Sequence, residues 1–104
     1  MQRHLRILNN FSEKLRKTFP EARVWLFGSY AKGEETSESD LDVCVVLPEI
    51  KREDRLAISD IAWEVGLSYD IHISTIVISQ SNFEHGPVSS SSLIHAIRTE
   101  GVAA

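Results

Sequence analysis

The sequence predicts an α/β protein, because helix-type and strand-type hydrophobic patterns alternate along its 104 residues. Some segments have apolar residues at three- and four-residue steps, whereas others are short apolar runs rich in β-branched side chains. Polar stretches with glycine, proline or serine separate the two kinds of segment. A chain of this length has room for one hydrophobic core, so we predict a single domain over residues 1–104.

The first part of the chain predicts a helix, a strand and a long loop. Residues from about 3 to 19 have the apolar spacing of an amphipathic helix, and Pro20 ends it. The run ARVWLF, residues 22–27, follows as a short and largely buried strand. Residues 28–39 hold two glycines, three serines and a threonine, which predicts a loop with room for one helical turn.

Two further strands and a second helix follow the loop. The run LDVCVVL, residues 41–47, is an apolar strand that ends at Pro48. Apolar residues then recur at helical spacing over residues 58–65, and Gly66 is the predicted stop of this helix. The run SYDIHISTIVIS, residues 68–79, is rich in β-branched residues and predicts the third strand.

The C-terminal part predicts a turn and a last short helix. The turn lies around EHGP, residues 84–87, and the helix contains the apolar residues of 93–97, with Gly101 just past its end. One of the four serines at 89–92 is expected to act as its N-cap.

The composition predicts a globular protein without a nucleic-acid-binding face. Hydrophobic residues make up 42% and charged residues 25% of the chain, which argues against wholesale disorder. Eleven basic residues against fifteen acidic ones give a net charge of −4, and no block of lysine and arginine stands out. We therefore expect no direct binding to DNA or RNA.

The sequence also predicts a cytoplasmic protein. No apolar run approaches the roughly 20 residues of a membrane helix, so no membrane contact is expected. The stretch MQRHLRILNN at the N-terminus lacks the apolar core and the cleavage site of a signal peptide. Cys44 is the lone cysteine, which excludes an internal disulfide and a cysteine-based zinc site, and we expect it to be a buried core thiol.

Two acidic residues lie where the second strand begins. Side chains two residues apart in a strand share a face, so the carboxylates of Asp40 and Asp42 are expected about 7 Å apart along one edge of the sheet. Both can reach one pair of divalent cations, an arrangement that recurs in phosphoryl and nucleotidyl transfer. Magnesium suits such a site because it prefers oxygen ligands and keeps waters that substrate phosphates can replace.

Other parts of the chain offer a third carboxylate and a phosphate-binding turn. Asp70 lies near the predicted start of the third strand, and it would lie beside the pair if the two strands are neighbours, about 4.8 Å apart. Gly28 and Ser29 follow the first strand, where glycine permits close backbone approach to a phosphate and serine adds a donor. Asp40, Asp42 and Asp70 are thus candidate metal ligands, and Gly28 and Ser29 are candidate nucleotide ligands.

Each of these features has a plainer interpretation. A Gly-Ser pair alone is usually a turn, an isolated Asp-any-Asp is usually a strand-edge feature, and Asp70 alone fits a solvated strand start. Their combination at this spacing favours the metal site. His72 can line the same cleft, although a partly buried structural histidine is the preferred interpretation, and Lys32 is weighed as a solvated lysine or a phosphate contact. Trp25 and Trp63 are expected in the core or at an interface.

The stretch GSYAKGEETSESDLDVCVV, residues 28–46, resembles the signature of the DNA polymerase beta-type nucleotidyltransferases. The likeness covers about residues 20–80; the small size and the ending IRTEGV resemble the minimal nucleotidyltransferase branch, the antitoxins of HEPN/MNT toxin–antitoxin pairs. It implies a small mixed β-sheet with helices packed on one face. It also implies that Gly28 and Ser29 bind the triphosphate of ATP, and that Asp40, Asp42 and Asp70 bind Mg²⁺. The stretch HGPVSSSS, residues 85–92, matches no feature of that branch.

The resemblance further implies an antitoxin enzyme with a protein partner. Members of this branch are commonly encoded beside a helical HEPN-type toxin, and the implied reaction transfers AMP from ATP to a tyrosine of that partner. A second interpretation is a non-catalytic binding module that neutralises its partner by forming a complex. A third is an enzyme that modifies a small molecule, which the short chain after Asp70 argues against. A homodimer stays open.

Overall fold

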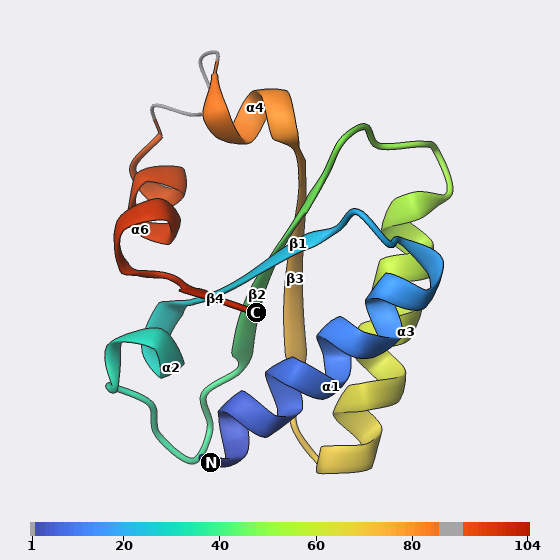
Figure 1. The fold of residues 1–104 in the computed structure, drawn as a ribbon. Coiled ribbons are helices and arrows are strands. Elements are labelled where there is room, and N and C mark those ends of the chain that lie inside the picture. The colour runs from blue at the N-terminus through green and yellow to red at the C-terminus, as the bar shows by residue number, and fades with distance from the viewer. Residues whose placement is uncertain (1, 86–90) are drawn as a thin grey trace.

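The computed structural model describes residues 2–85 and 91–104. Its helices and strands are α1 (Arg3–Thr18), β1 (Arg23–Phe27), α2 (Gly28–Lys32), β2 (Leu41–Leu47), α3 (Asp54–Tyr69), β3 (Ile73–Ser79), α4 (Gln80–Glu84), α6 (Ser92–Glu100) and β4 (Val102–Ala103). The strands form one sheet in the order β3-β2-β1-β4 (Figure 1). β2 and β3 are parallel, whereas β1 is antiparallel to both β2 and β4. The predicted mixed sheet in an α/β fold is therefore confirmed.

The main core lies between the sheet and the two long helices, α1 and α3, which lie side by side (Figure 1). From β2, the odd-numbered side chains Leu41, Val43, Val45 and Leu47 enter this core. Apolar residues of both long helices meet them, including Ile7, Leu8, Phe11, Leu15, Ile58 and Val65. Full burial of each such side chain contributes roughly 1.5–3 kcal/mol, so this layer supplies most of the hydrophobic stabilisation.

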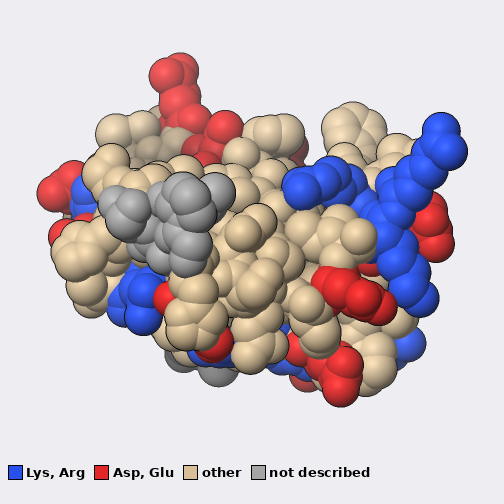
Figure 2. Space-filling model, turned by 90° about the horizontal axis from the view of Figure 1, so that it is seen from above, with Lys and Arg blue, Asp and Glu red and all other residues tan. Residues whose placement is uncertain are grey.

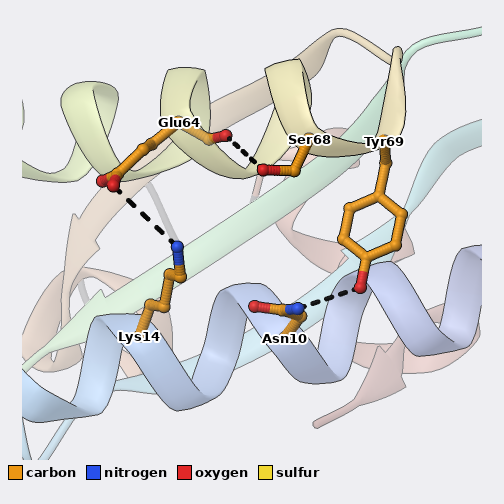
Figure 3. Close-up of polar contacts among 5 residues, drawn as sticks. All are labelled: Asn10, Lys14, Glu64, Ser68 and Tyr69. Carbon is orange, nitrogen blue, oxygen red and sulfur yellow. Dashed lines mark hydrogen bonds and ion pairs between the residues drawn. The ribbon is translucent and has the colours of Figure 1, made fainter.

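Polar contacts fasten α1 to α3 along the rim of this core (Figure 3). The side-chain amide of Asn10 donates a hydrogen bond to the Tyr69 hydroxyl at 2.9 Å, and Lys14 lies 3.9 Å from the Glu64 carboxylate. The guanidinium of Arg3 also donates to the backbone carbonyl of Tyr69. Because two of these contacts meet at Tyr69, they hold the C-terminal end of α3 against α1.

The other face of the sheet is covered by the short helices α4 and α6, which corrects the expectation that helices pack on one face only. A second buried cluster contains Cys44, Val46, Ile78, Phe83, Ile94 and Ile97. β2 therefore contacts apolar groups on both faces, which its nearly continuous apolar sequence reflects. Burial raises the pKa of the Cys44 thiol to about 12, so it is a protonated core residue, as predicted.

The end of α3 differs from the prediction. Gly66 does not stop the helix, which continues to Tyr69 and is capped by Asp70 in the left-handed conformation, φ 53°. Gly66 is buried, and a Cβ there would lie 2.5 Å from the carbonyl oxygen of Ile71. Because Gly66 has no side chain, the backbone at Ile71 can pass close to α3. The strand predicted over residues 68–79 begins only at Ile73, because its first two residues belong to α3.

The C-terminal elements agree in part with the sequence. The predicted last helix is α6, and the Ser91 hydroxyl caps it by accepting a hydrogen bond from the Ile94 amide. The short helix α4 and the two-residue strand β4 were not predicted. The predicted turn at residues 84–87 and the unmatched stretch at 85–92 lie partly outside the described residues.

The charged surface is mixed. Figure 2 shows Lys and Arg gathered toward the side of α1 and α3, with Asp and Glu among them. Among the described residues, no helix combines the length and the apolar character that crossing a membrane requires.

Candidate functional site

The candidate site lies where β1 ends and β2 begins. Phe27, the last residue of β1, is paired with Asp42 across the antiparallel ladder. Gly28 follows in the left-handed conformation, φ 74°, and opens α2. A Cβ on Gly28 would lie 2.2 Å from Oδ2 of Asp42, closer than any non-bonded contact allows. The glycine is therefore required both for its backbone angle and for the space that the Asp42 carboxylate fills.

Ser29 follows Gly28 at the start of α2. Ser29 is half-buried, and no side chain of the described residues caps the N-terminus of α2. The first backbone N–H groups of a helix have no partner within it, so these amides are free to meet a ligand. The helix ends at Gly33, which is also left-handed, φ 73°. The predicted loop with room for one turn is thus a short helix followed by an exposed segment.

Asp40 directly precedes β2, and Asp42 is the second residue of that strand. The amide of Leu41 donates a 2.9 Å hydrogen bond to the His72 carbonyl, and Asp42 is in register with Ser74. This parallel pairing places His72 next to Asp40. Burial raises the pKa of Asp42, the negative charge of Asp40 raises it further, and His72 acts in the opposite direction.

His72 is the site residue that the sequence interpretation undervalued. Its side chain is exposed, not the partly buried structural group that was preferred, and its charge acts on Asp42. The sequence held one signal for this: His72 is two residues beyond Asp70 in a segment predicted to pair with the strand of Asp42. Only the parallel register shows that it lies opposite Asp40.

Asp70 lies in a different local structure from the one predicted. It is the exposed cap of α3 and precedes β3, because the helix extends to Tyr69. Within residues 2–85 and 91–104, no group of three or more His, Cys, Asp or Glu side chains is arranged to hold a metal ion. The role of Asp70 as a third metal ligand therefore stays a prediction.

The remaining candidates have structural surroundings that explain them. Lys32 lies 3.9 Å from the Glu100 carboxylate, and both side chains are exposed. Trp25 packs beside Phe83 in the second cluster. Trp63 is 67% exposed on α3, so a core role for it is wrong.

The donor set at the start of β2 suits a hard divalent cation. Asp40 and Asp42 offer carboxylate oxygens, the ligands that Mg²⁺ prefers. In the described part of the chain, neither carboxylate forms an ion pair with a basic side chain. Their mutual repulsion is consequently left for a bound cation to relieve.

A family model and several known proteins are similar to this chain. The model of the family described as "Nucleotidyltransferase domain" matches residues 8–98. The chain is 42% identical over 60 residues to the candidate protein adenylyltransferase MJ0141 of Methanocaldococcus jannaschii, an alignment that covers 57% of this chain. The chain spans 61% of the length of that relative.

Solved structures show the same fold. A toxin–antitoxin structure with AMP-PNP has a chain that aligns with a TM-score of 0.59 at 21% identity, covering 90% of this chain and 69% of its own. A structure of the tri-AMPylated Shewanella oneidensis HEPN toxin in complex with an MNT antitoxin gives 0.58 at 18% identity, with 96% and 70% covered.

Two glycines with the same backbone angle test the contact between Gly28 and Asp42. Gly28→Ala and Gly33→Ala each force alanine into the left-handed region, which costs on the order of 1–3 kcal/mol in urea unfolding. Only Gly28→Ala places a Cβ against Asp42, because nothing lies within 4 Å of a Cβ on Gly33. The ¹³C NMR signal of the Asp42 carboxyl should therefore shift in Gly28→Ala alone. Equal shifts in both variants would disprove the contact.

The raised pKa of Asp42 predicts a pH-dependent effect of Asp42→Asn. The contribution of this group to stability is fully present below the unfolded pKa of 3.8 and is lost as pH rises through the higher folded value. Without metal, Asp42→Asn should therefore gain free energy of unfolding relative to the parent at neutral pH, and lose that gain in acid. Urea unfolding at both pH values measures this difference. A difference that does not change with pH would contradict the prediction.

Proposed function

The chain belongs to the nucleotidyltransferase domain family, and from this membership we propose that it is a Mg²⁺-dependent enzyme that transfers AMP from ATP to a hydroxyl group. The acceptor is a tyrosine of a HEPN-type toxin partner. The observation that carries the proposal is the fit of the Asp42 carboxylate against Gly28. This contact supports a shared site for the predicted phosphate-binding turn and Asp42, one of the predicted metal ligands.

The carboxylates of Asp40 and Asp42 would hold Mg²⁺, with Asp70 as the predicted third ligand. When bound, Mg²⁺ neutralises charge on the phosphates and on the oxygens that exchange at phosphorus. The position of the two carboxylates would be well defined, because Asp42 lies in β2, a strand that is buried on both faces, and Asp40 directly precedes it. A rigid strand keeps its first side chains in place at little entropic cost.

The turn at Gly28 and Ser29 would orient the triphosphate. The left-handed glycine has no side chain to keep a phosphate away from the backbone, and the Ser29 hydroxyl and the uncapped amides of α2 are donors. Hydrogen bonds to charged oxygens are the stronger kind, at about 1.5–3 kcal/mol each. Holding the phosphates in one pose is the principal task of such a site, since positioning and electrostatics supply most of the catalysis of phosphoryl transfer.

The proposed reaction forms one bond and breaks one. The acceptor oxygen bonds to the α-phosphorus of ATP while the bond from that phosphorus to the bridging oxygen of the β-phosphate breaks. Pyrophosphate leaves, and the hydroxyl proton passes to water. A partner that presents the hydroxyl would complete the site.

The names of similar proteins support the proposed reaction and the proposed class of partner. One relative is named as a candidate protein adenylyltransferase, and one similar structure contains an AMPylated HEPN toxin with an MNT antitoxin. A nucleotide analogue is present in another toxin–antitoxin structure. Transfer of AMP to a HEPN-type partner is the function that these likenesses favour.

One observation favours a second candidate function. The described residues do not bring three acidic side chains together at the site. If Asp70 stays in its turn, the chain has two metal ligands and would act as a non-catalytic antitoxin that neutralises its partner by forming a complex. The two candidates differ in a covalent product, which mass spectrometry detects.

Incubation with Mg-ATP and the neighbouring gene's product should add AMP to that partner. The intact mass of the partner should rise by one or more AMP units with the parent chain and stay unchanged with Asp40→Asn, because loss of one metal ligand removes charge neutralisation at phosphorus. Ser29→Ala should keep metal binding and weaken ATP binding roughly tenfold or more. A tight complex without any change in the mass of the partner would instead support the non-catalytic binding module.

A further inference from the structure

The outer edge of the sheet at β3 is open. β3 is a terminal strand of the sheet, and in the described part of the chain it pairs with β2 alone. The amide of Leu41 donates to the carbonyl of His72, so the even-numbered residues of this segment direct their backbone groups toward β2. The N–H and C=O groups of the odd-numbered residues Ile73, Thr75 and Val77 therefore point away from the sheet.

One of these outward groups already has a partner. The guanidinium of Arg55 donates a 2.9 Å hydrogen bond to the carbonyl of Val77, which agrees with the outward direction of the odd-numbered groups. Among residues 2–85 and 91–104, no group bonds to the outward N–H and C=O groups of Ile73 and Thr75. Two donors and two acceptors are thus available to another strand.

The sequence of β3 does not protect this edge. Proteins usually guard an exposed edge strand with charged residues, proline, a bulge or very short length. β3 reads ISTIVIS over Ile73–Ser79, with no charge and no proline, and it pairs with β2 without a bulge. Such a strand favours pairing with a further strand.

Apolar side chains are exposed beside the same edge. Trp63 is 67% exposed and Leu67 is 63% exposed, one turn apart on α3. Both line a hollow of about 300 Å³ that also includes Ile73, at the start of β3. The contacts of α3 with α1 use Glu64 and Tyr69, so the apolar pair lies on another side of the helix. Large apolar groups exposed together commonly mark an interaction surface.

We propose that β3 pairs antiparallel with β3 of a second copy of this chain, in a dimer with twofold symmetry. Ile73 of one protomer lies opposite the partner's Thr75, and Thr75 opposite the partner's Ile73. Each opposed pair exchanges both of its N–H···O bonds, so this register uses all four free groups. It also leaves the carbonyl of Val77 to Arg55.

The same symmetry brings the exposed apolar pair of each protomer toward its partner. The twofold axis of an antiparallel strand pair is perpendicular to the sheet, so both α3 helices lie on one side of the joined sheet. They run in opposite directions, and Trp63 and Leu67 of one protomer cover the hollow beside the partner's β3. Burial of these side chains supplies the hydrophobic part of the interface.

The charges near this edge are complementary to themselves. In the proposed register Val77 lies opposite the partner's Ile71, so Arg55 at Val77 faces the partner's Asp70. Asp70 is exposed, and neither it nor Arg55 forms an ion pair with a described residue. A symmetric dimer needs a surface that complements itself. The backbone groups, the apolar pair and the two charges all meet this condition, which favours a second copy over an unrelated strand.

The dimer does not depend on the proposed function. β1 is separated from β3 by β2, so the turn at Gly28 lies away from the dimer edge. Mg-ATP binding, measured by calorimetry, should be kept when the dimer is lost through Trp63→Glu. Failure of nucleotide binding in the parent chain would contradict the proposed function and leave the dimer unaffected.

Sedimentation equilibrium of the chain alone tests the proposal. Without metal ions, which keeps Asp70 free for Arg55, the parent should approach twice the 11.7 kDa of one chain as its concentration rises. Trp63→Glu should raise the dissociation constant of the dimer roughly thirtyfold or more, as loss of a buried interface tryptophan commonly does. Leu56→Glu is the matched control, because Leu56 is 68% exposed on α3 but does not line the hollow.

A second variant and hydrogen exchange test the strand pairing itself. Thr75→Pro removes only an outward N–H, which an edge strand tolerates, and it should also weaken the dimer. The amides of Ile73 and Thr75 should exchange slowly in the parent and quickly in Trp63→Glu. A monomer at every concentration, equal weakening by Trp63→Glu and Leu56→Glu, or fast exchange of both amides within the dimer would overturn the proposal. Protection of these amides only after addition of the neighbouring gene's product would assign the edge to that partner instead.

Discussion

The contact between the Asp42 carboxylate and Gly28 is the constraint on which the rest of the site depends. Oδ2 occupies the space that a Cβ on Gly28 would need. The pairing of Phe27 with Asp42 sets this distance, so the register of β1 on β2 decides whether turn and carboxylate meet. A shift of one residue would turn Asp42 to the opposite face. The hydrophobic core that fixes the register therefore also fixes the site.

The position of the carboxylates follows from the cost of burying charge. From Val43 onward β2 is enclosed on both faces, where an unpaired carboxylate would be very costly. Asp40 is exposed and Asp42 half-buried, so they lie where β2 meets solvent. The charged form of Asp42 is still disfavoured, because burial and the negative charge of Asp40 raise its pKa. A bound cation would offset both effects, which couples the stability of this edge to ligand binding.

The sequence predicted those features that depend on local patterns. Continuous apolar character located β2 at residues 41–47, and helical periodicity located α1. The end of α3 was missed because a glycine that stops a helix and one that admits a neighbouring chain look alike, and Gly66 is of the second kind. The left-handed backbone conformation of Asp70 has no recognisable sequence pattern either. The approach of Asp42 to Gly28 joins residues fourteen positions apart, and only the strand register reveals it.

Paramagnetic NMR with Mn²⁺ and ATP tests the central claim most directly, because Mn²⁺ broadens the signals of nearby nuclei. The account places the metal and the phosphates between the turn after β1 and the start of β2. The amide signals of residues 28–29 and 40–42 should therefore broaden together, while those of residues 51–54, at the other end of β2, should stay sharp. Broadening confined to the acidic loop at residues 34–38, or to residues 51–54, would contradict the account.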